Sequence, residues 1–145
     1  MKLKSDKVSK LLFLKKFLKH GTRVASFTPS SITLSKEICR FVNPITPQVI
    51  VELGCGTGSF TQVICDRMHY KSKLFSFELD PQFAEITTKR CPKATVILSC
   101  AKSVKDELLK KGIKNYDLLI NGLAPAHLPI DVNDAIFSLF AEQNE

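Results

Sequence analysis

Three glycines at alternate positions follow an apolar segment in this 145-residue sequence. Residues 49–53 read Val-Ile-Val-Glu-Leu, and directly after them come Gly54, Gly56 and Gly58. A near-continuous apolar run is typical of a strand buried on both faces in a parallel sheet. Glycine has no Cβ, so a glycine-rich turn lets backbone N–H groups approach a polar ligand closely. The sequence therefore predicts a strand that leads into a nucleotide-binding turn and then a helix.

The spacing of the glycines differs from two common phosphate-binding patterns. A dinucleotide fingerprint, Gly-x-Gly-x-x-Gly, would place its third glycine where this chain has Ser59. A P-loop would need Gly-Lys-Ser or Gly-Lys-Thr, which does not follow. What remains is Glu-x-Gly-x-Gly-x-Gly, beginning at Glu52, which resembles the first motif of class I S-adenosylmethionine-dependent methyltransferases.

A second apolar segment ends in an acid at a distance that supports ligand binding. Residues 74–79 read Leu-Phe-Ser-Phe-Glu-Leu, and Glu78 lies 20 positions after Gly58. In a strand–helix–strand unit an acid at this distance reaches the ribose hydroxyls, which need a fixed hydrogen-bond acceptor. A solvated acidic loop is the simpler alternative, but the pairing with the glycine turn favours ligand binding.

The remaining pattern predicts an α/β domain. Apolar segments at 94–99 and 116–121 add two strands, and helices are expected at 81–90, 103–111 and 131–143. Alternating strands and helices wind by right-handed crossovers into a mainly parallel, Rossmann-like sheet with helices on both faces. Ligands bind such sheets at the carboxyl ends of the strands.

The positive charge of the chain is concentrated at its amino terminus. The net charge is +7, and residues 1–23 hold eight basic residues and one acidic residue, so the remainder is neutral. Between 8 and 20 the apolar residues fall mainly on one side of a helix, and Lys15, Lys16 and Lys19 fall on the other. Such a helix suits an anionic membrane surface or nucleic acid, and packing against its own domain is the alternative.

The cysteines and the amino-terminal segment indicate a cytoplasmic protein. The five cysteines form no Cys-x-x-Cys pair and the three histidines complete no zinc pattern, so we expect reduced thiols and no metal site. The longest unbroken apolar run of that segment is residues 11–14. That run is too short for a secretory signal or for a membrane span of about 20 residues.

Three segments resemble bacterial phospholipid N-methyltransferases, which are themselves similar to rRNA adenine dimethyltransferases. They are Phe-Thr-Pro-Ser-Ser at 27–31, the strand and glycine turn through Thr61, and Asn-Gly-Leu at 121–123 with Leu-Pro at 128–129. The resemblance implies that S-adenosyl-L-methionine is the cofactor and that Gly54, Gly56 and Gly58 hold its methionine part. It also implies that Glu78 binds the ribose and that Asn121 borders the transferred methyl group.

In the reaction of this family the protein itself takes little part in covalent chemistry. The cofactor sulfonium already carries an activated methyl group, so the site mainly holds a neutral amine in line with it. A protonated amine must first lose its proton. His127 and Asp131 follow the fourth strand and could accept it, although a loop histidine is more often a bystander and Asp131 suits a helix N-cap.

Two departures from the family weigh against activity. We assign Glu52 and Cys100 to the cofactor-binding residues as well. Cys100 stands where the family commonly has an acid that binds the adenine amino group. The family fold also normally continues into three further strands, so this chain is expected to be shortened and its fourth strand to be an open edge. A partner chain covering that edge is one solution.

We therefore expect a basic amphipathic helix at 1–22 and an incomplete methyltransferase domain at 23–145. The favoured function is methylation of a phospholipid amine, of the phosphatidylethanolamine type, by an enzyme peripheral to the inner face of the membrane. Residues 8–20 would bind the anionic membrane. One alternative is an RNA adenine N6-methyltransferase, with RNA the less favoured partner because Asn121 lacks the Asn-x-Pro-aromatic context. The other is an inactive cofactor-binding or interaction module.

Overall fold

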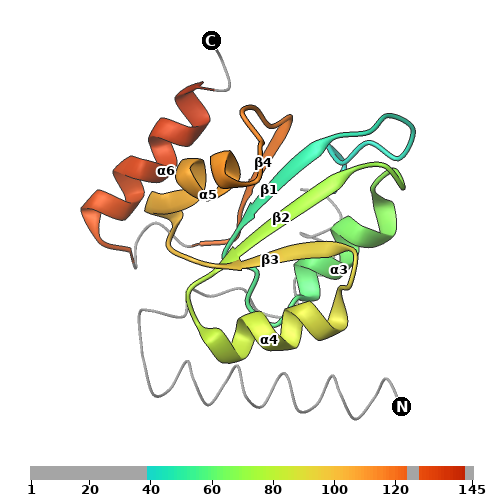
Figure 1. Ribbon diagram of the computed structural model, residues 1–145, viewed down its shortest axis with the longest axis horizontal. Coiled ribbons are helices and arrows are strands. Elements are labelled where there is room, and N and C mark those ends of the chain that lie inside the picture. Colours follow the sequence, from blue (N-terminus) through green and yellow to red (C-terminus); the bar gives the residue numbers. More distant parts are fainter. Residues whose placement is uncertain (1–38, 124–127, 143–145) are drawn as a thin grey trace.

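Residues 39–123 and 128–142 are described by a computed structural model of the chain, and they form one sheet with helices on both faces (Figure 1). The expected helix at 8–20, the Pro-Ser-Ser segment and His127 lie outside the described residues. In the described parts of the chain, no helix has both the length and the apolar character needed to cross a bilayer.

Four parallel strands make up the sheet, in the order β3-β2-β1-β4. They are β1 (Val49–Leu53), β2 (Lys73–Glu78), β3 (Ala94–Leu98) and β4 (Leu118–Asn121). Leu53 at the end of β1 lies beside Phe77 of β2 and Asn121 of β4, so the carboxyl ends of these strands meet. The strand order reverses between β1 and β4, and at such a switch point a parallel sheet opens a ligand crevice.

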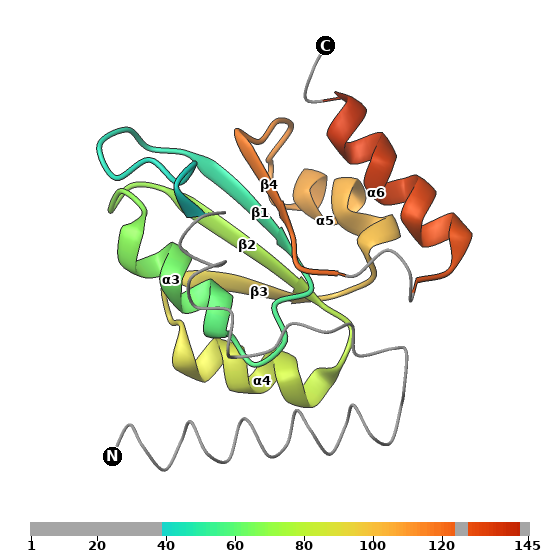
Figure 2. The same ribbon diagram turned by 180° about the vertical axis from the view of Figure 1, so that it is seen from behind.

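Helices cover both faces of the sheet, as the two opposite views show (Figures 1 and 2). One face carries α3 (Ser59–Arg67) and α4 (Pro81–Arg90), and the other carries α5 (Val104–Lys110) and α6 (Ile130–Glu142). Alternate strand residues supply the two cores. Val51, Leu53, Phe75 and Phe77 pack toward α5 and α6, whereas Ile50, Leu74 and Ile120 pack toward α3.

Local sequence explains where the helices begin and end. The Asp80 carboxylate accepts hydrogen bonds from the N–H groups of Gln82 and Phe83, and Pro81 occupies the first position of α4. Gly112 has a φ of 75° just after α5, a left-handed conformation that glycine adopts without strain. These signals fix α4 and α5 close to their predicted bounds.

The predicted α/β class and alternation of elements are confirmed, and the expected mainly parallel sheet is parallel throughout the described strands. The predicted start of the last helix was wrong. Asp131 was expected to cap the last helix, but α6 begins at Ile130 and places Asp131 inside its first turn. Across the ranges that the structure describes, β4 pairs with β1 alone.

Candidate cofactor-binding site

The glycine turn is held at the carboxyl end of β1 by backbone hydrogen bonds. Gly54, Gly56 and Gly58 have φ values of 74°, 55° and 84°, which side chains on L-residues rarely allow. The N–H groups of Gly54 and Cys55 both donate to the Phe77 carbonyl, at 2.8 and 3.2 Å. The turn is therefore anchored to the neighbouring strand β2.

The three glycines are needed for different reasons. A Cβ on Gly54 would lie 2.4 Å from Leu123 Cδ2, and one on Gly58 would lie 3.0 Å from Thr87 Oγ1. Among the residues that the structure describes, apart from its chain neighbours, a Cβ on Gly56 would meet no atom within 4 Å. Gly54 and Gly58 thus allow close packing of the protein on itself, whereas Gly56 borders open space. A Cβ there would occupy room that a ligand could use, so the turn fits a bound cofactor.

Glu78, the expected ribose acceptor, lies beside the central glycine. Its Oε2 accepts the Gly56 N–H at 2.8 Å, and its Oε1 accepts the N–H groups of Leu79 and Asp80 at 3.0 Å each. A carboxylate offers about four lone-pair sites, so three donors leave capacity for a ligand hydroxyl. Burial raises the pKa of Glu78, and the N–H groups of Asp80, Gly56 and Leu79 oppose that rise.

Glu52 lies beneath the turn and is almost fully buried, with 1% of its surface exposed. Its Oε2 accepts hydrogen bonds from the hydroxyls of Ser76 on β2, at 2.6 Å, and Thr61 on α3, at 2.8 Å. Burial raises the Glu52 pKa to about 7, although both hydroxyls oppose the rise. The carboxyl therefore ties β1, β2 and α3 together under the glycine turn.

Cys100 and Asn121 reach the same end of the sheet from strands on either side. Cys100 is half-buried just after β3, and the preceding Ser99 N–H donates to the Glu78 carbonyl at 3.1 Å. Asn121 ends β4, and its Oδ1 accepts the Leu123 N–H at 3.0 Å. The structure thus brings Glu78 and the central glycine into contact, with Cys100 and Asn121 on flanking strands.

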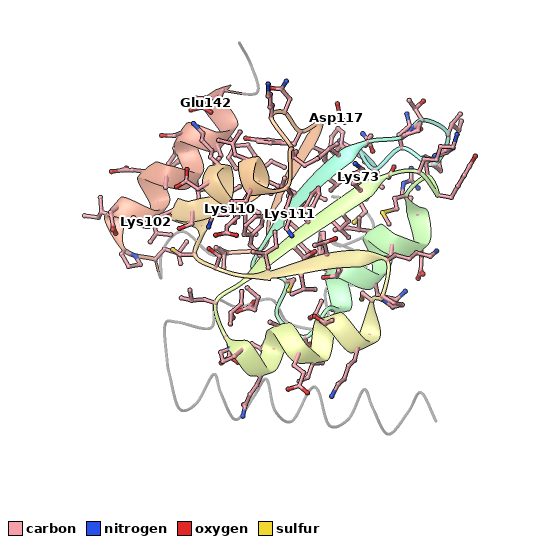
Figure 3. The ribbon with its side chains drawn as sticks, viewed as in Figure 1. Lys73, Lys102, Lys110, Lys111, Asp117 and Glu142 are labelled. Atoms are coloured by element: carbon pink, nitrogen blue, oxygen red, sulfur yellow. The ribbon has the colours of Figure 1, made fainter. Side chains whose placement is uncertain are left out.

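Asp131 is placed for a structural role. Its exposed carboxylate pairs with the Lys102 ammonium at 2.6 Å, and Figure 3 shows Lys102 on the segment that precedes α5. The hydrogen bond from Lys102 lowers the Asp131 pKa. A carboxylate that is already stabilised in its charged form is a weak proton acceptor. In the described part of the chain, no group of three His, Cys, Asp or Glu residues could hold a metal ion.

Sequence reasoning missed the hydroxyl groups that support the site. Thr61 and Ser76 hold Glu52, and the Thr87 hydroxyl donates to the Gly56 carbonyl at 2.8 Å. Thr87 lies 31 residues from its partner. No spacing rule links these positions, because each contact depends on how a helix packs against the sheet.

Comparison with curated proteins identifies similar sequences. The chain is 36% identical over 129 residues to an ornithine lipid N-methyltransferase from Singulisphaera acidiphila, a match covering 87% of this chain and 67% of that protein. It is 30% identical over 115 residues to a malonyl-[acyl-carrier protein] O-methyltransferase from Anoxybacillus flavithermus, covering 79% and 42%. The chain thus spans about two thirds of the first relative and under half of the second. No family model matches it.

Solved structures share the fold at low sequence identity. Fibrillarin from Aeropyrum pernix, in complex with natively bound S-adenosyl-L-methionine, matches with a TM-score of 0.51 and 14% identity, over 65% of this chain and 42% of that one. A putative rRNA methylase from Clostridium thermocellum matches with a TM-score of 0.55 and 16% identity, over 81% and 63%.

Proposed function

This chain belongs to the class I S-adenosylmethionine-dependent methyltransferases, and from that premise we propose that it methylates the amine of a membrane lipid. Binding of S-adenosylmethionine at the glycine turn is supported above all by the hydrogen bond between the Gly56 N–H and Glu78, at the point where the strand order reverses. The choice of a lipid amine as the methyl acceptor is supported by the similarity to a protein named an ornithine lipid N-methyltransferase. Ornithine lipids and phosphatidylethanolamine both present an amine.

The residues of the site divide the work of binding. Bound S-adenosylmethionine supplies the activated methyl group. Gly54, Gly56 and Gly58 shape the turn that holds the methionine part of the cofactor, with Gly56 at the open side and Gly54 and Gly58 packed against Leu123 and Thr87. Glu78 accepts hydrogen bonds from the ribose hydroxyls of the cofactor. Asn121 at the end of β4 borders the reacting amine. Positioning accounts for most of the rate that such a site provides.

The amino-terminal segment is proposed to bring this site to its substrate. Residues 1–22 would form a basic amphipathic helix, with residues 8–20 on the anionic inner face of the membrane, and residues 23–145 would form the methyltransferase domain. The sheet edge at β4 is proposed to be covered by a partner chain.

A methyl-transfer assay tests the substrate. The purified chain is incubated with methyl-labelled S-adenosylmethionine and vesicles of ornithine lipid, phosphatidylethanolamine or phosphatidylcholine, or with RNA. We expect label in the first two lipids and none in phosphatidylcholine, whose nitrogen is already quaternary. Label in RNA alone would replace this function with the RNA alternative. A chain that binds the cofactor but labels nothing would be a binding module.

Membrane binding is tested with variants matched in charge. Replacing Lys15, Lys16 and Lys19 by glutamine removes three charges from the amphipathic segment and should abolish binding to anionic vesicles. The control variant carries glutamine at three exposed lysines of the described domain, namely Lys71, Lys93 and Lys111. It loses the same charge and should bind as the parent does. Equal losses would show that only net charge matters.

A further inference from the structure

One buried hydroxyl connects α4 to the glycine turn. Thr87 is fully buried, and its Oγ1 donates to the Gly56 carbonyl at 2.8 Å. Its Cγ2 would lie 3.1 Å from a Cβ placed on Gly58, so the same side chain also packs against the end of the turn. Because a buried hydroxyl has to be hydrogen-bonded, this contact fixes both the position of Thr87 and that of the carbonyl it holds.

Gly56 is thereby held on both sides. Its N–H donates to Glu78 Oε2 at 2.8 Å, and its carbonyl accepts from Thr87. These two bonds fix the two peptide groups that meet at the Gly56 Cα. No atom lies within 4 Å of where its Cβ would be, so packing on that side does not restrain the residue. The positive φ of 55° is held by hydrogen bonds to β2 and α4.

We propose that Thr87 is a positioning residue for S-adenosylmethionine, which acts by fixing the Gly56 peptide so that the turn and Glu78 keep the geometry that receives the cofactor. Loss of the hydroxyl leaves the Gly56 carbonyl without this donor and lets the adjoining peptide rotate. That rotation turns the Gly56 carbonyl and the Thr57 N–H about the Gly56 Cα, so the turn loses the shape that receives the cofactor. The proposal rests on the cofactor site of the proposed function and is independent of the methyl acceptor.

The next residue of α4 provides a matched control. Thr88 Oγ1 also donates to a backbone carbonyl, that of Ala84 at 2.7 Å, but this bond lies within the helix itself. Thr87→Val and Thr88→Val each replace a hydroxyl by a methyl group at adjacent helical positions. They share the same change in helix propensity, and they differ in burial, because Thr88 is exposed, and in whether the lost bond reaches the turn. Thr87→Ser keeps the hydroxyl and removes only a methyl group.

The experiment measures cofactor affinity of the full chain by calorimetric titration with S-adenosylmethionine. In Thr87→Val the cofactor has to restore the ordered turn as it binds, so the free energy of the lost hydrogen bond is subtracted from binding and the affinity should fall roughly tenfold. Thr87→Ser and Thr88→Val should stay within about twofold of the parent. The amide resonance of Thr57, whose N–H shares a peptide group with the Gly56 carbonyl, should shift in a nitrogen–proton NMR spectrum of Thr87→Val. It should hold its position in Thr88→Val, which a general loosening of α4 would not produce.

Equal affinities for Thr87→Val and the parent would overturn the proposal, as would equal weakening by Thr88→Val. Should Thr87→Val fail to fold, Thr87→Cys takes its place, because the thiol has a similar size and donates only weakly. An intermediate loss of affinity is then expected, and parental affinity overturns the proposal. A parent chain that binds no S-adenosylmethionine would instead overturn the cofactor assignment, and this proposal with it.

Discussion

Replacing Glu52 by glutamine should remove a pH dependence that one buried carboxyl gives to this fold. Glu52 is 1% exposed, and its hydroxyl donors are Ser76 and Thr61. Burial raises its pKa from 4.5 to about 7 against the effect of the two hydroxyls, and the nearby charge of Glu78 contributes to the rise. Glutamine has nearly the same shape and keeps a carbonyl oxygen for the two donors, but it does not titrate.

The sign of the effect follows from proton binding in the two states. Between pH 4.5 and about 7 the folded state holds a proton on Glu52 that the unfolded state has released. The contribution of Glu52 to the free energy of unfolding is therefore fully present below pH 4.5. It is lost as the pH rises through the folded-state pKa of about 7. The two pKa values correspond to about 3 kcal/mol in total, of which about 2.5 kcal/mol is lost between pH 5 and pH 8.

Urea unfolding at pH 5, 6, 7 and 8 measures this loss. The parent should lose about 2.5 kcal/mol more unfolding free energy across that range than Glu52→Gln does. Glu85→Gln is the control, because Glu85 is exposed and pairs with Lys89, whose hydrogen bond lowers its pKa. It should retain the slope of the parent between pH 5 and 8. A Glu52→Gln profile parallel to that of the parent would refute the reasoning.

Three further substitutions test the turn, and a fourth, Gly112→Ala, serves as a control outside it. Gly56→Ala and Gly112→Ala both place a Cβ at positive φ with no atom within 4 Å, so each should lower the unfolding free energy by about 1 kcal/mol in urea titrations. Only Gly56→Ala should also weaken cofactor binding, and equal binding by the two variants would contradict the role of Gly56. Glu78→Ala removes the acceptor of three backbone N–H groups and should weaken S-adenosylmethionine binding at least tenfold by calorimetry, so parental affinity would mean the ribose is held elsewhere. In Gly122→Ala the new Cβ would lie 3.0 Å from the carbonyl oxygens of Leu53 and Gly54, so backbone must shift and stability should fall by about 1–3 kcal/mol; an unchanged melting temperature would show that the turn yields freely.

The sequence predicts the parts of this fold that depend on local pattern. Apolar runs that end in Leu53 and Glu78 predict strands, and three glycines after the first run predict a tight turn, which the structure confirms. The parallel direction of the strands then follows from the helices between them, because a helical crossover returns the chain to the same end of the sheet. Pro81 and Gly112 mark helix ends for reasons that act within a few residues.

The contacts that shape the site depend on packing between elements and could not be predicted in this way. The motif predicts that Glu52 binds the cofactor. Its position under the turn, by contrast, depends on burial and on hydrogen bonds from two hydroxyls of other elements. Thr87 carries no motif at all, because its importance arises only where α4 meets Gly56. Asp131 looks like a helix cap until the start of α6 at Ile130 places it beside Lys102.

Strand β4 is an edge strand of the described sheet. Asp117, which directly precedes β4 and is labelled in Figure 3, accepts the Val49 N–H at 2.7 Å and so joins the start of β4 to β1. Within residues 39–123 and 128–142 the other edge of β4 has no strand beside it. The glycine turn that follows β1 is hydrogen-bonded to β2 through the Phe77 carbonyl and Glu78, and to α4 through Thr87.

Calorimetric titration of the 145-residue chain with S-adenosylmethionine, and separately with its demethylated product, tests the central claim most directly. The hydrogen bonds around Gly56 and Glu78 predict saturable micromolar binding of both ligands, with one site per chain. Circular dichroism of the same sample shows whether the chain is folded. A folded chain that binds neither ligand would contradict the cofactor site described here.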